Sequence, residues 1–312
     1  MKKFIIKVSA FTVITIGLFI VFLFLLPPTP RATGSHLFGA IKKDSLLLNV
    51  PSSRIIFIGG SNLSFGLNSQ TIKDSLELNP INTAIHAGIG IKYMLENTLQ
   101  YVQKGDIIVL IPEYQHFYRK WHHGSEELLR TILEINKSKI KLLSLNQIFN
   151  CIPFTGNLVL SKLDNFEYIP VEDSKTGIYE VNSFNRYGDA YLHWDMQRID
   201  SFEPDTIMII DEYNPKVMQE IKKYNQKFQE KGTTLFISYP SYQDISFFNS
   251  EKAIKKIEQE YITSGLIILG TPERYRMPDS LMFDTPYHLN KTGVDYRTKL
   301  LIEDIRKHIA PN

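Results

Sequence analysis

The chain has 312 residues, of which 43% are hydrophobic and 22% are charged, a balance that excludes an intrinsically disordered protein. Its formal net charge is +2, but residues 1–50 alone carry six basic residues and one acid. Subtracting these from the totals leaves 29 basic and 32 acidic side chains in the rest of the chain, a charge of −3. A slightly acidic body argues against nucleic acid as a partner, because nucleic-acid binding needs clustered positive charge. The single cysteine, Cys151, excludes an intrachain disulfide and a cysteine-rich zinc site.

A stretch of nineteen uncharged, mostly apolar residues runs from Val8 to Leu26. At about 1.5 Å per residue it predicts roughly 28 Å of helix, close to the bilayer core of about 30 Å. Lys2, Lys3 and Lys7 precede it, so the positive-inside rule places the N-terminus in the cytoplasm and the body in the periplasm or outside the cell. The alternative is a cleaved signal peptide, whose apolar region is usually about 7–15 residues and ends at small residues. The longer run and its bulky end favour an uncleaved anchor.

The domain organisation follows from this front end. We expect residues 1–27 to form the membrane anchor and residues 28–50 to form a linker stiffened by prolines. Residues 51–312 have the length of one large domain. Within it, residues 137–205 are less regular and rich in Asn, Tyr and Asp, which predicts an insertion or lid.

Apolar runs and helical patterns alternate along the body. The runs predict buried strands over residues 54–58, 81–85, 106–111, 234–238 and 266–269. Helical patterns cover residues 91–102, 214–231 and 249–264 and a last helix that reaches Ile309, with Thr292 and Asp295 as its capping box. This order predicts an α/β fold: a three-layer α/β/α sandwich with a mostly parallel, flavodoxin-like sheet, preceded by one transmembrane helix.

Ser61 is the first candidate for chemistry. Ligands of such sheets bind beyond the carboxyl ends of the strands, where the first strand delivers Gly59-Gly60-Ser61-Asn62. A serine behind two glycines can present its hydroxyl at a tight turn, although a Gly-Gly-Ser turn is also ordinary loop chemistry.

Two further segments offer partners for Ser61. Asp284 stands four residues before His288 and can accept the Nδ1 proton of the imidazole, which leaves Nε2 free as a base. The alternative is an incidental surface histidine beside Asn290, a helix cap. Gly88 lies in a glycine loop before a helix, where backbone N–H groups can face a developing oxyanion or simply fit the helix to the sheet.

In this order the three segments resemble the SGNH (GDSL-like) hydrolase superfamily, over about residues 54–116 and 281–302. Gly59-Gly60-Ser61-Asn62 is similar to the nucleophile block Gly-Asp-Ser-Leu, with Gly60 in place of the aspartate. Gly88 is similar to the glycine of the second block. Asp284 and His288 resemble the closing Asp-x-x-His block with one extra residue between them. The resemblance is strongest to membrane-anchored envelope members that act in the acylation or deacylation of surface polymers.

The resemblance implies an acyl-serine mechanism. Ser61 would be the nucleophile, His288 the general base and Asp284 its partner. The N–H groups of Ser61 and Gly88 would bind the oxyanion, and no metal or other cofactor is implied.

One element of the family pattern is missing. The third block normally supplies an asparagine as an oxyanion donor, whereas the matching strand end here carries Glu113. Glu113 is either a protonated donor in an apolar pocket or a structural, polar-network residue. Asn62 and Asn185 are candidates to replace the donor, and Asn185 and Glu113 are candidates for the substrate rim.

The remaining histidines receive a structural interpretation. His116, His122 and His123 fall within eight residues but lack a metal-binding spacing, so we expect a solvated loop there rather than a metal site.

The function that these features predict is a membrane-tethered serine esterase or O-acyltransferase. Its substrate would be ester-linked acyl groups of an envelope or extracellular polysaccharide, and a multipass membrane acyltransferase is a candidate partner if the reaction is transfer. The alternative is a catalytically silent SGNH-like protein that binds polymer or scaffolds envelope assembly.

Overall fold

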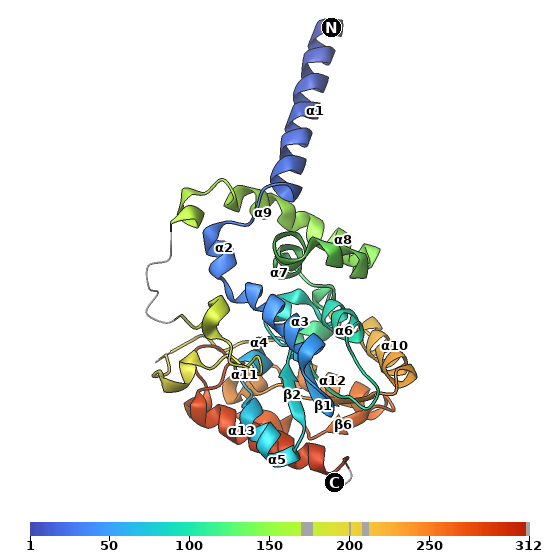
Figure 1. Ribbon diagram of the computed structural model, residues 1–312, viewed down its shortest axis with the longest axis vertical. Helices are drawn as coiled ribbons and strands as arrows, with labels where there is room; N and C mark the ends of the chain where they lie inside the picture. Colours follow the sequence, from blue (N-terminus) through green and yellow to red (C-terminus); the bar gives the residue numbers. More distant parts are fainter. Residues whose placement is uncertain (170–176, 200, 208–211, 310–312) are drawn as a thin grey trace.

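The structure is a computed structural model that describes residues 1–169, 177–199, 201–207 and 212–309. A long N-terminal helix, α1 (Lys2–Phe24), stands out from the body (Figure 1). Within those ranges α1 is the one helix long and apolar enough to cross a bilayer. Its length and position suit a membrane anchor or a signal sequence.

Five parallel strands form the central sheet, in the order β2-β1-β3-β4-β6. Their bounds are β1 (Arg54–Gly59), β2 (Asn79–Asn82), β3 (Ile107–Ile111), β4 (Thr234–Ser238) and β6 (Ile267–Leu269). A separate two-stranded parallel pair joins β5 (Tyr242–Gln243) and β7 (Arg276–Met277). The predicted α/β fold and its flavodoxin-like strand order are therefore confirmed.

Helices cover both faces of the sheet. The body contains α4 (Ser61–Ser64), α5 (Ser69–Leu76), α6 (Ile91–Leu99), α7 (Glu126–Arg130), α8 (Leu145–Cys151), α9 (Thr155–Ser161), α10 (Lys216–Glu230), α11 (Asp244–Asn249), α12 (Glu251–Ile262) and α13 (Lys291–Arg306). A π-helical turn, Thr131–Ile135, continues α7. Because the chain reverses its direction across the sheet after β2, right-handed crossovers put α5 on the face opposite α6, α10 and α12. The contact of α13 with α5 completes the outer layers.

The same reversal creates a switch point between β1 and β3. These two strands are neighbours, yet their onward connections leave toward opposite edges of the sheet. Gly59 at the end of β1 lies opposite Ile111 at the end of β3. Ligands of open α/β sheets bind at such a point, so Ser61 and Glu113 start from the expected position for a site.

Two local predictions about β2 and α13 were wrong. The second strand was expected over residues 81–85 but ends at Asn82, whose buried amide donates to Leu63 O and Asp189 Oδ1 and turns the chain away. Helix α13 begins at Lys291 and is capped by Asn290, whose side chain accepts the Gly293 N–H at 3.0 Å. Thr292 therefore lies inside the first turn and is not the cap.

The expected linker, residues 28–50, is folded against the body. It contains α2 (Pro30–Gly34) and α3 (Gly39–Asn49). Leu47 is buried in the main core, and the buried Lys43 ammonium donates to Ala84 O and to Gly188 O. Burial lowers the pKa of Lys43 to about 7. The segment is thus part of the domain, because its apolar face and its lysine have partners there.

The predicted insertion, residues 137–205, divides into two parts within the described ranges. Residues 137–169, which include α8 and α9, lie at the base of α1 (Figure 1). Residues 177–199 run beside the candidate site, which they reach through Tyr179.

The expectation of a solvated histidine loop was also wrong. The His116 side chain is fully buried, and His122 is only 2% exposed. His116 Nδ1 accepts the Glu113 N–H, and its Nε2 therefore donates to Ala87 O at 2.9 Å. The ring ties the end of β3 to the loop that follows β2.

A buried ion pair fixes the opposite end of β1. Arg54 Nε donates to Asp106 Oδ1 at 2.9 Å, and both side chains are at most 1% exposed. The remaining guanidinium donors reach Leu47 O and Tyr101 O. This pair joins the starts of β1 and β3 and the folded N-terminal segment.

Replacing Asp106 by alanine should lower the free energy of unfolding by about 3–5 kcal/mol, because the buried Arg54 charge loses its partner. Chemical unfolding followed by tryptophan fluorescence measures the change. Glu251→Ala removes an exposed i,i+4 pair with Lys255 and should leave the free energy of unfolding nearly unchanged, because water screens this pair. Equal losses in the two variants would contradict the structural role of the buried pair.

The burial of His122 predicts acid sensitivity. Burial, followed by the neighbouring His123, lowers the pKa of His122 to about 3. Between about pH 6.5 and about pH 3 the unfolded chain therefore binds more protons than the folded chain. As the pH is lowered through this window, the free energy of unfolding should decrease by about 1.4 kcal/mol per pH unit for this group. Unfolding at about pH 7 and about pH 5 should show a shallower pH dependence in His122→Gln than in the wild type. The same dependence in His122→Gln and in the exposed control His308→Gln would contradict this origin.

Candidate active site

Ser61 is the first residue of α4, directly beyond the end of β1. The residue before it, Gly60, has no room for a side chain. A Cβ there would lie 2.5 Å from Glu113 Oε1 and 2.9 Å from Ala87 Cα. Glycine therefore stands where the SGNH pattern has aspartate because the Glu113 carboxylate fills that space.

Glu113 is a hydrogen-bond acceptor at the centre of the site. Its side chain is 2% exposed, and Oε1 accepts from Ser61 Oγ at 3.2 Å, Asn62 N at 3.1 Å and Asn62 Nδ2 at 3.4 Å. Of the two expectations for Glu113, this geometry fits the structural, polar-network residue. It does not fit a donor aimed at substrate.

Neither candidate asparagine presents a free donor to substrate. Asn62 is fully buried, and its amide nitrogen is used by Glu113 and by Ile111 O. Asn185 orders its own turn: Oδ1 accepts from the N–H groups of Tyr187 and Asp189, and Nδ2 donates to Asp189.

The Gly88 N–H is also engaged. It donates to His86 Nδ1 at 3.0 Å, while Gly88 O accepts the Ser125 N–H at 2.7 Å. The preceding N–H, that of Ala87, donates to no atom in the described part of the chain. It lies 3.0 Å from the position that a Gly60 Cβ would occupy. Ala87 is thus the better placed backbone donor beside Ser61, and the glycine pattern alone did not identify it.

Asp284 and His288 form a hydrogen-bonded pair. His288 Nδ1 lies 2.8 Å from Asp284 Oδ1, and both side chains are nearly buried. Burial raises the pKa of Asp284, but the hydrogen bond and charge of His288 and the hydrogen bond from Tyr179 together outweigh burial, and the net pKa is below the ordinary value. The ionised carboxylate can only accept, so Nδ1 carries the proton. Nε2 makes no hydrogen bond within the described residues and is free to act as a base.

Tyr179 adds a second donor to Asp284. Its hydroxyl donates to Asp284 Oδ2 and lies 3.2 Å from His288 Nδ1. Burial, with the charge of Asp284, raises the pKa of Tyr179 far above its usual range, so the phenol stays protonated. The sequence did not identify Tyr179, because it belongs to the insertion and no spacing relates it to Asp284.

Phe65 connects the serine helix to the imidazole. It follows α4 and stacks on His288, with ring centroids 4.3 Å apart and an angle of 14° between the planes. Phe65 thus contacts both partners, because its N–H also donates to Ser61 O at 2.9 Å. No hydrogen bond joins their side chains, because the Ser61 hydroxyl donates to Glu113.

The folded N-terminal segment forms one wall of the site. His36 lies 5.8 Å from both His86 and Tyr179, measured between ring centroids, and its N–H donates to Tyr179 O. Burial, followed by the neighbouring His86, lowers the pKa of His36 to about 4. The His36 ring at this wall of the site is therefore uncharged at neutral pH.

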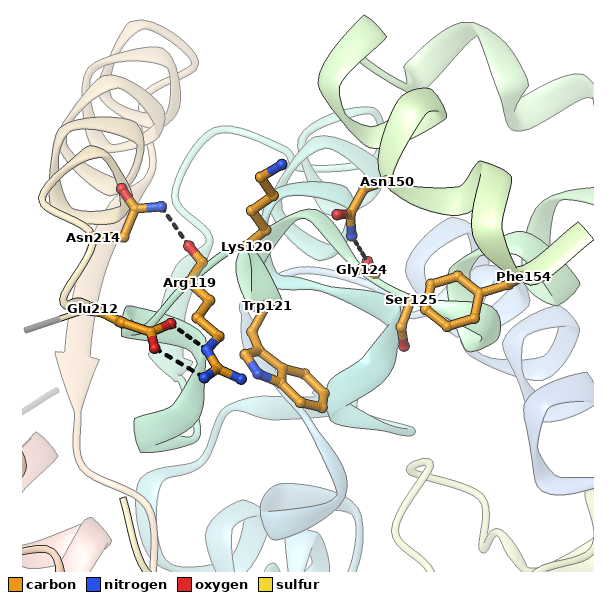
Figure 2. A pocket seen from close by; sticks show the side chains of 9 residues that line it. All are labelled: Arg119, Lys120, Trp121, Gly124, Ser125, Asn150, Phe154, Glu212 and Asn214. Carbon is orange, nitrogen blue, oxygen red and sulfur yellow. Dashed lines mark hydrogen bonds and ion pairs between the residues drawn. The ribbon is translucent and has the colours of Figure 1, made fainter. Parts of the chain in front are cut away.

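A hollow that shares no residue with Ser61, Asp284 or His288 lies next to Gly88, the partner of its lining residue Ser125. It has a volume of about 660 Å³ and is lined by Arg119, Lys120, Trp121, Gly124, Ser125, Asn150, Phe154, Glu212 and Asn214. Figure 2 shows the Arg119–Glu212 ion pair on one side, Phe154 on the other, and Trp121 between them. Its link to the site is the Ser125 N–H, which binds Gly88 O. Among the described residues, no three His, Cys, Asp or Glu side chains are grouped to hold a metal ion.

Comparisons with known proteins provide little information about this chain. No family model and no curated protein matches the chain. Its structure is similar to the crystal structure of protein YXIM from Bacillus subtilis, with a TM-score of 0.36 and 12% sequence identity. The match covers 82% of this chain and 57% of the other, so this chain spans little more than half the length of that protein. A match at this TM-score is informative about neither the site nor the activity.

Proposed function

We propose that the protein is a membrane-tethered serine esterase or O-acyltransferase of the SGNH type. Its substrates are ester-linked acyl groups of an envelope or extracellular polysaccharide. The observation that carries the proposal is the Asp284–His288 hydrogen bond, which leaves Nε2 free beside the helix that begins with Ser61.

In the proposed reaction, the Ser61 hydroxyl turns from Glu113 toward His288. Catalytic hydrogen bonds are often long or misaligned in free enzymes and form fully only with substrate. Nε2 takes the hydroxyl proton while Oγ bonds to the ester carbonyl carbon, and the same proton then goes to the departing alkoxide. Asp284 stabilises the imidazolium, and water or a sugar hydroxyl releases the acyl group from Ser61.

The oxyanion is assigned to backbone donors. The N–H of Ser61, at the start of α4, and the N–H of Ala87 are the donors that remain unused near the serine. Gly88 joins them only if its N–H leaves His86 Nδ1. Asn62 stays in the network of Glu113.

The membrane tether is supported by contacts at the base of α1. Lys162 Nζ donates to Phe22 O and Leu26 O, and Lys137 Nζ donates to Phe24 O. A helix packed in this way behaves as a part of the protein, which favours an anchor over a cleaved signal. The three lysines before the apolar run support an orientation with the N-terminus in the cytoplasm and the body in the periplasm or outside the cell.

A polysaccharide substrate is supported by the hollow beside Gly88. Trp121 is 40% exposed there, and Phe154 and planar polar groups line the same surface. Aromatic faces with amide and guanidinium neighbours suit sugar rings. If the reaction is transfer, a multipass membrane acyltransferase is the partner that would supply the acyl group across the bilayer.

One observation favours the second candidate, a catalytically silent protein that binds polymer or scaffolds envelope assembly. The Ser61 hydroxyl is bonded to Glu113 instead of to His288. In a silent protein this contact would be permanent, and the serine would serve to hold β1 to β3.

Covalent labelling separates the two candidates. A fluorophosphonate probe should form a phosphonyl ester with Ser61 in the full-length protein, because His288 activates the hydroxyl and fluoride leaves. Ser61→Ala and His288→Ala should abolish the label. Ser75→Ala and His308→Ala, outside the site, should keep it. Absence of label in folded wild-type protein would support the silent protein.

A second experiment compares how much Asp284 and Tyr179 contribute to the activation of Ser61 by His288. Asp284→Asn should slow labelling by about 10⁴-fold, because an amide permits the wrong tautomer of the imidazole. Tyr179→Phe should slow it by only about 10–100-fold, since one hydrogen bond to a charged group is worth about 1.5–3 kcal/mol. Labelling rates at a fixed probe concentration measure both effects. Equal rates in Asp284→Asn and the wild type would exclude the triad.

A further inference from the structure

Exposed apolar side chains gather at the base of α1. Ten of the 21 exposed large apolar residues that follow Leu25 in the described chain fall within residues 137–169, which we call the platform. They are Ile140, Leu145, Ile148, Phe149, Ile152, Leu160, Leu163, Phe166, Tyr168 and Ile169. A water-exposed cluster of this kind marks an interaction surface.

The apolar residues of the platform face away from the body. Helices α8 and α9 both contact α7, and their buried residues are Gln147 and Cys151 in α8 and Leu158 and Val159 in α9. Phe149, 64% exposed, and Leu160, 65% exposed, belong to the same two helices but not to those buried faces. The platform therefore has one side packed on the domain and one apolar side without a partner in the described residues.

Contacts with α1 fix the position of the platform relative to the end of this helix. Helix α9 packs against α1, and Leu23 near the end of α1 is buried. Lys162 and Lys137 donate to the last carbonyl groups of α1, those of Phe22 and Phe24, and Lys162 also donates to Leu26 O just beyond the helix. A helix of 23 residues is about 35 Å long, slightly more than a bilayer core of about 30 Å. When α1 spans a membrane, its end lies at the membrane surface, and the platform lies there with it (Figure 1).

The amino-acid composition of the platform favours lipid as its binding partner. Bulky apolar residues in short helices lie beside the exposed Lys141, whereas Lys139 is buried in an ion pair with Asp44 and Lys137 and Lys162 bind the end of α1. Interfacial helices insert such apolar faces at the boundary between headgroups and acyl chains, while lysines meet anionic phosphates.

We propose that residues 137–169 are a second membrane contact, a monotopic platform that inserts its apolar side into the lipid leaflet around the end of α1. The inference rests on the tether in the proposed function and is independent of the chemistry of Ser61. The platform and α1 together hold the body in one orientation on the bilayer.

The test uses the full chain in nanodiscs of phosphatidylcholine and phosphatidylglycerol. A Cys151→Ser background removes the native thiol, which is buried. Phe149→Cys and Leu160→Cys then receive an environment-sensitive nitrobenzoxadiazole label. Phe248→Cys, at an exposed phenylalanine of α11, is the matched control.

Both platform labels should show blue-shifted emission and about twofold quenching by lipids with a nitroxide on the acyl chain, because interfacial helices bury their apolar faces roughly 5–10 Å deep. The Phe248 label should show neither effect. Water-like, unquenched emission at the platform in protein that is bound to the disc would overturn the proposal. Labels that are exposed in nanodiscs but shielded in native membranes would overturn it in favour of a protein partner.

Two readouts separate this proposal from those before it. Protein that elutes without lipid would mean that the tether itself fails, and the platform fails with it. Fluorophosphonate labelling of the same samples reports on Ser61 whatever the platform does. If Ser61 is not labelled, the fluorescence of the platform labels still tests the membrane contact independently.

Discussion

The Glu113 carboxylate is the contact on which the candidate site depends. It stands at the end of β3 and accepts three hydrogen bonds from the residues that follow β1. This fixes the start of α4 and hence Ser61. It also requires glycine at position 60, since any side chain there would meet the carboxylate. A buried acceptor at the switch point of the sheet thus holds the serine and explains why glycine stands at position 60, where the SGNH pattern has aspartate.

The rest of the site comes from segments far apart in the chain. The closing loop supplies Asp284 and His288, the insertion supplies Tyr179, and the N-terminal segment supplies His36. The Asp284 and His288 side chains are nearly buried, so Coulombic and hydrogen-bonding effects between them are strong. The ionised Asp284, held by two donors, sets the tautomer of His288. The arrangement of the candidate site therefore depends on the folded insertion as much as on the sheet.

The strands and the Asp284–His288 pair could be predicted from the sequence because their signals are local. Apolar runs between turn residues indicate buried strands, and a carboxylate four residues from a histidine can close one loop. Tyr179, Phe65 and Ala87 could not be predicted, because their roles arise from contacts between distant segments. The burial of His116 was missed for the same reason: its polar atoms are satisfied by backbone groups that are brought near only by the fold. Composition likewise led to the prediction that residues 28–50 form a linker. The prediction was wrong because Lys43 and Leu47 pack into the domain.

Because residues 28–50 are folded, they limit how far the body can move away from the end of α1. A flexible tether lets a domain sample a volume that grows with tether length. Here α2 and α3 are packed on the body, and lysine side chains bind the end of α1. Ser61 therefore lies at a fixed distance from the end of α1. If the protein has the proposed esterase or acyltransferase activity, it can act only on acyl groups that come within this distance of the end of α1.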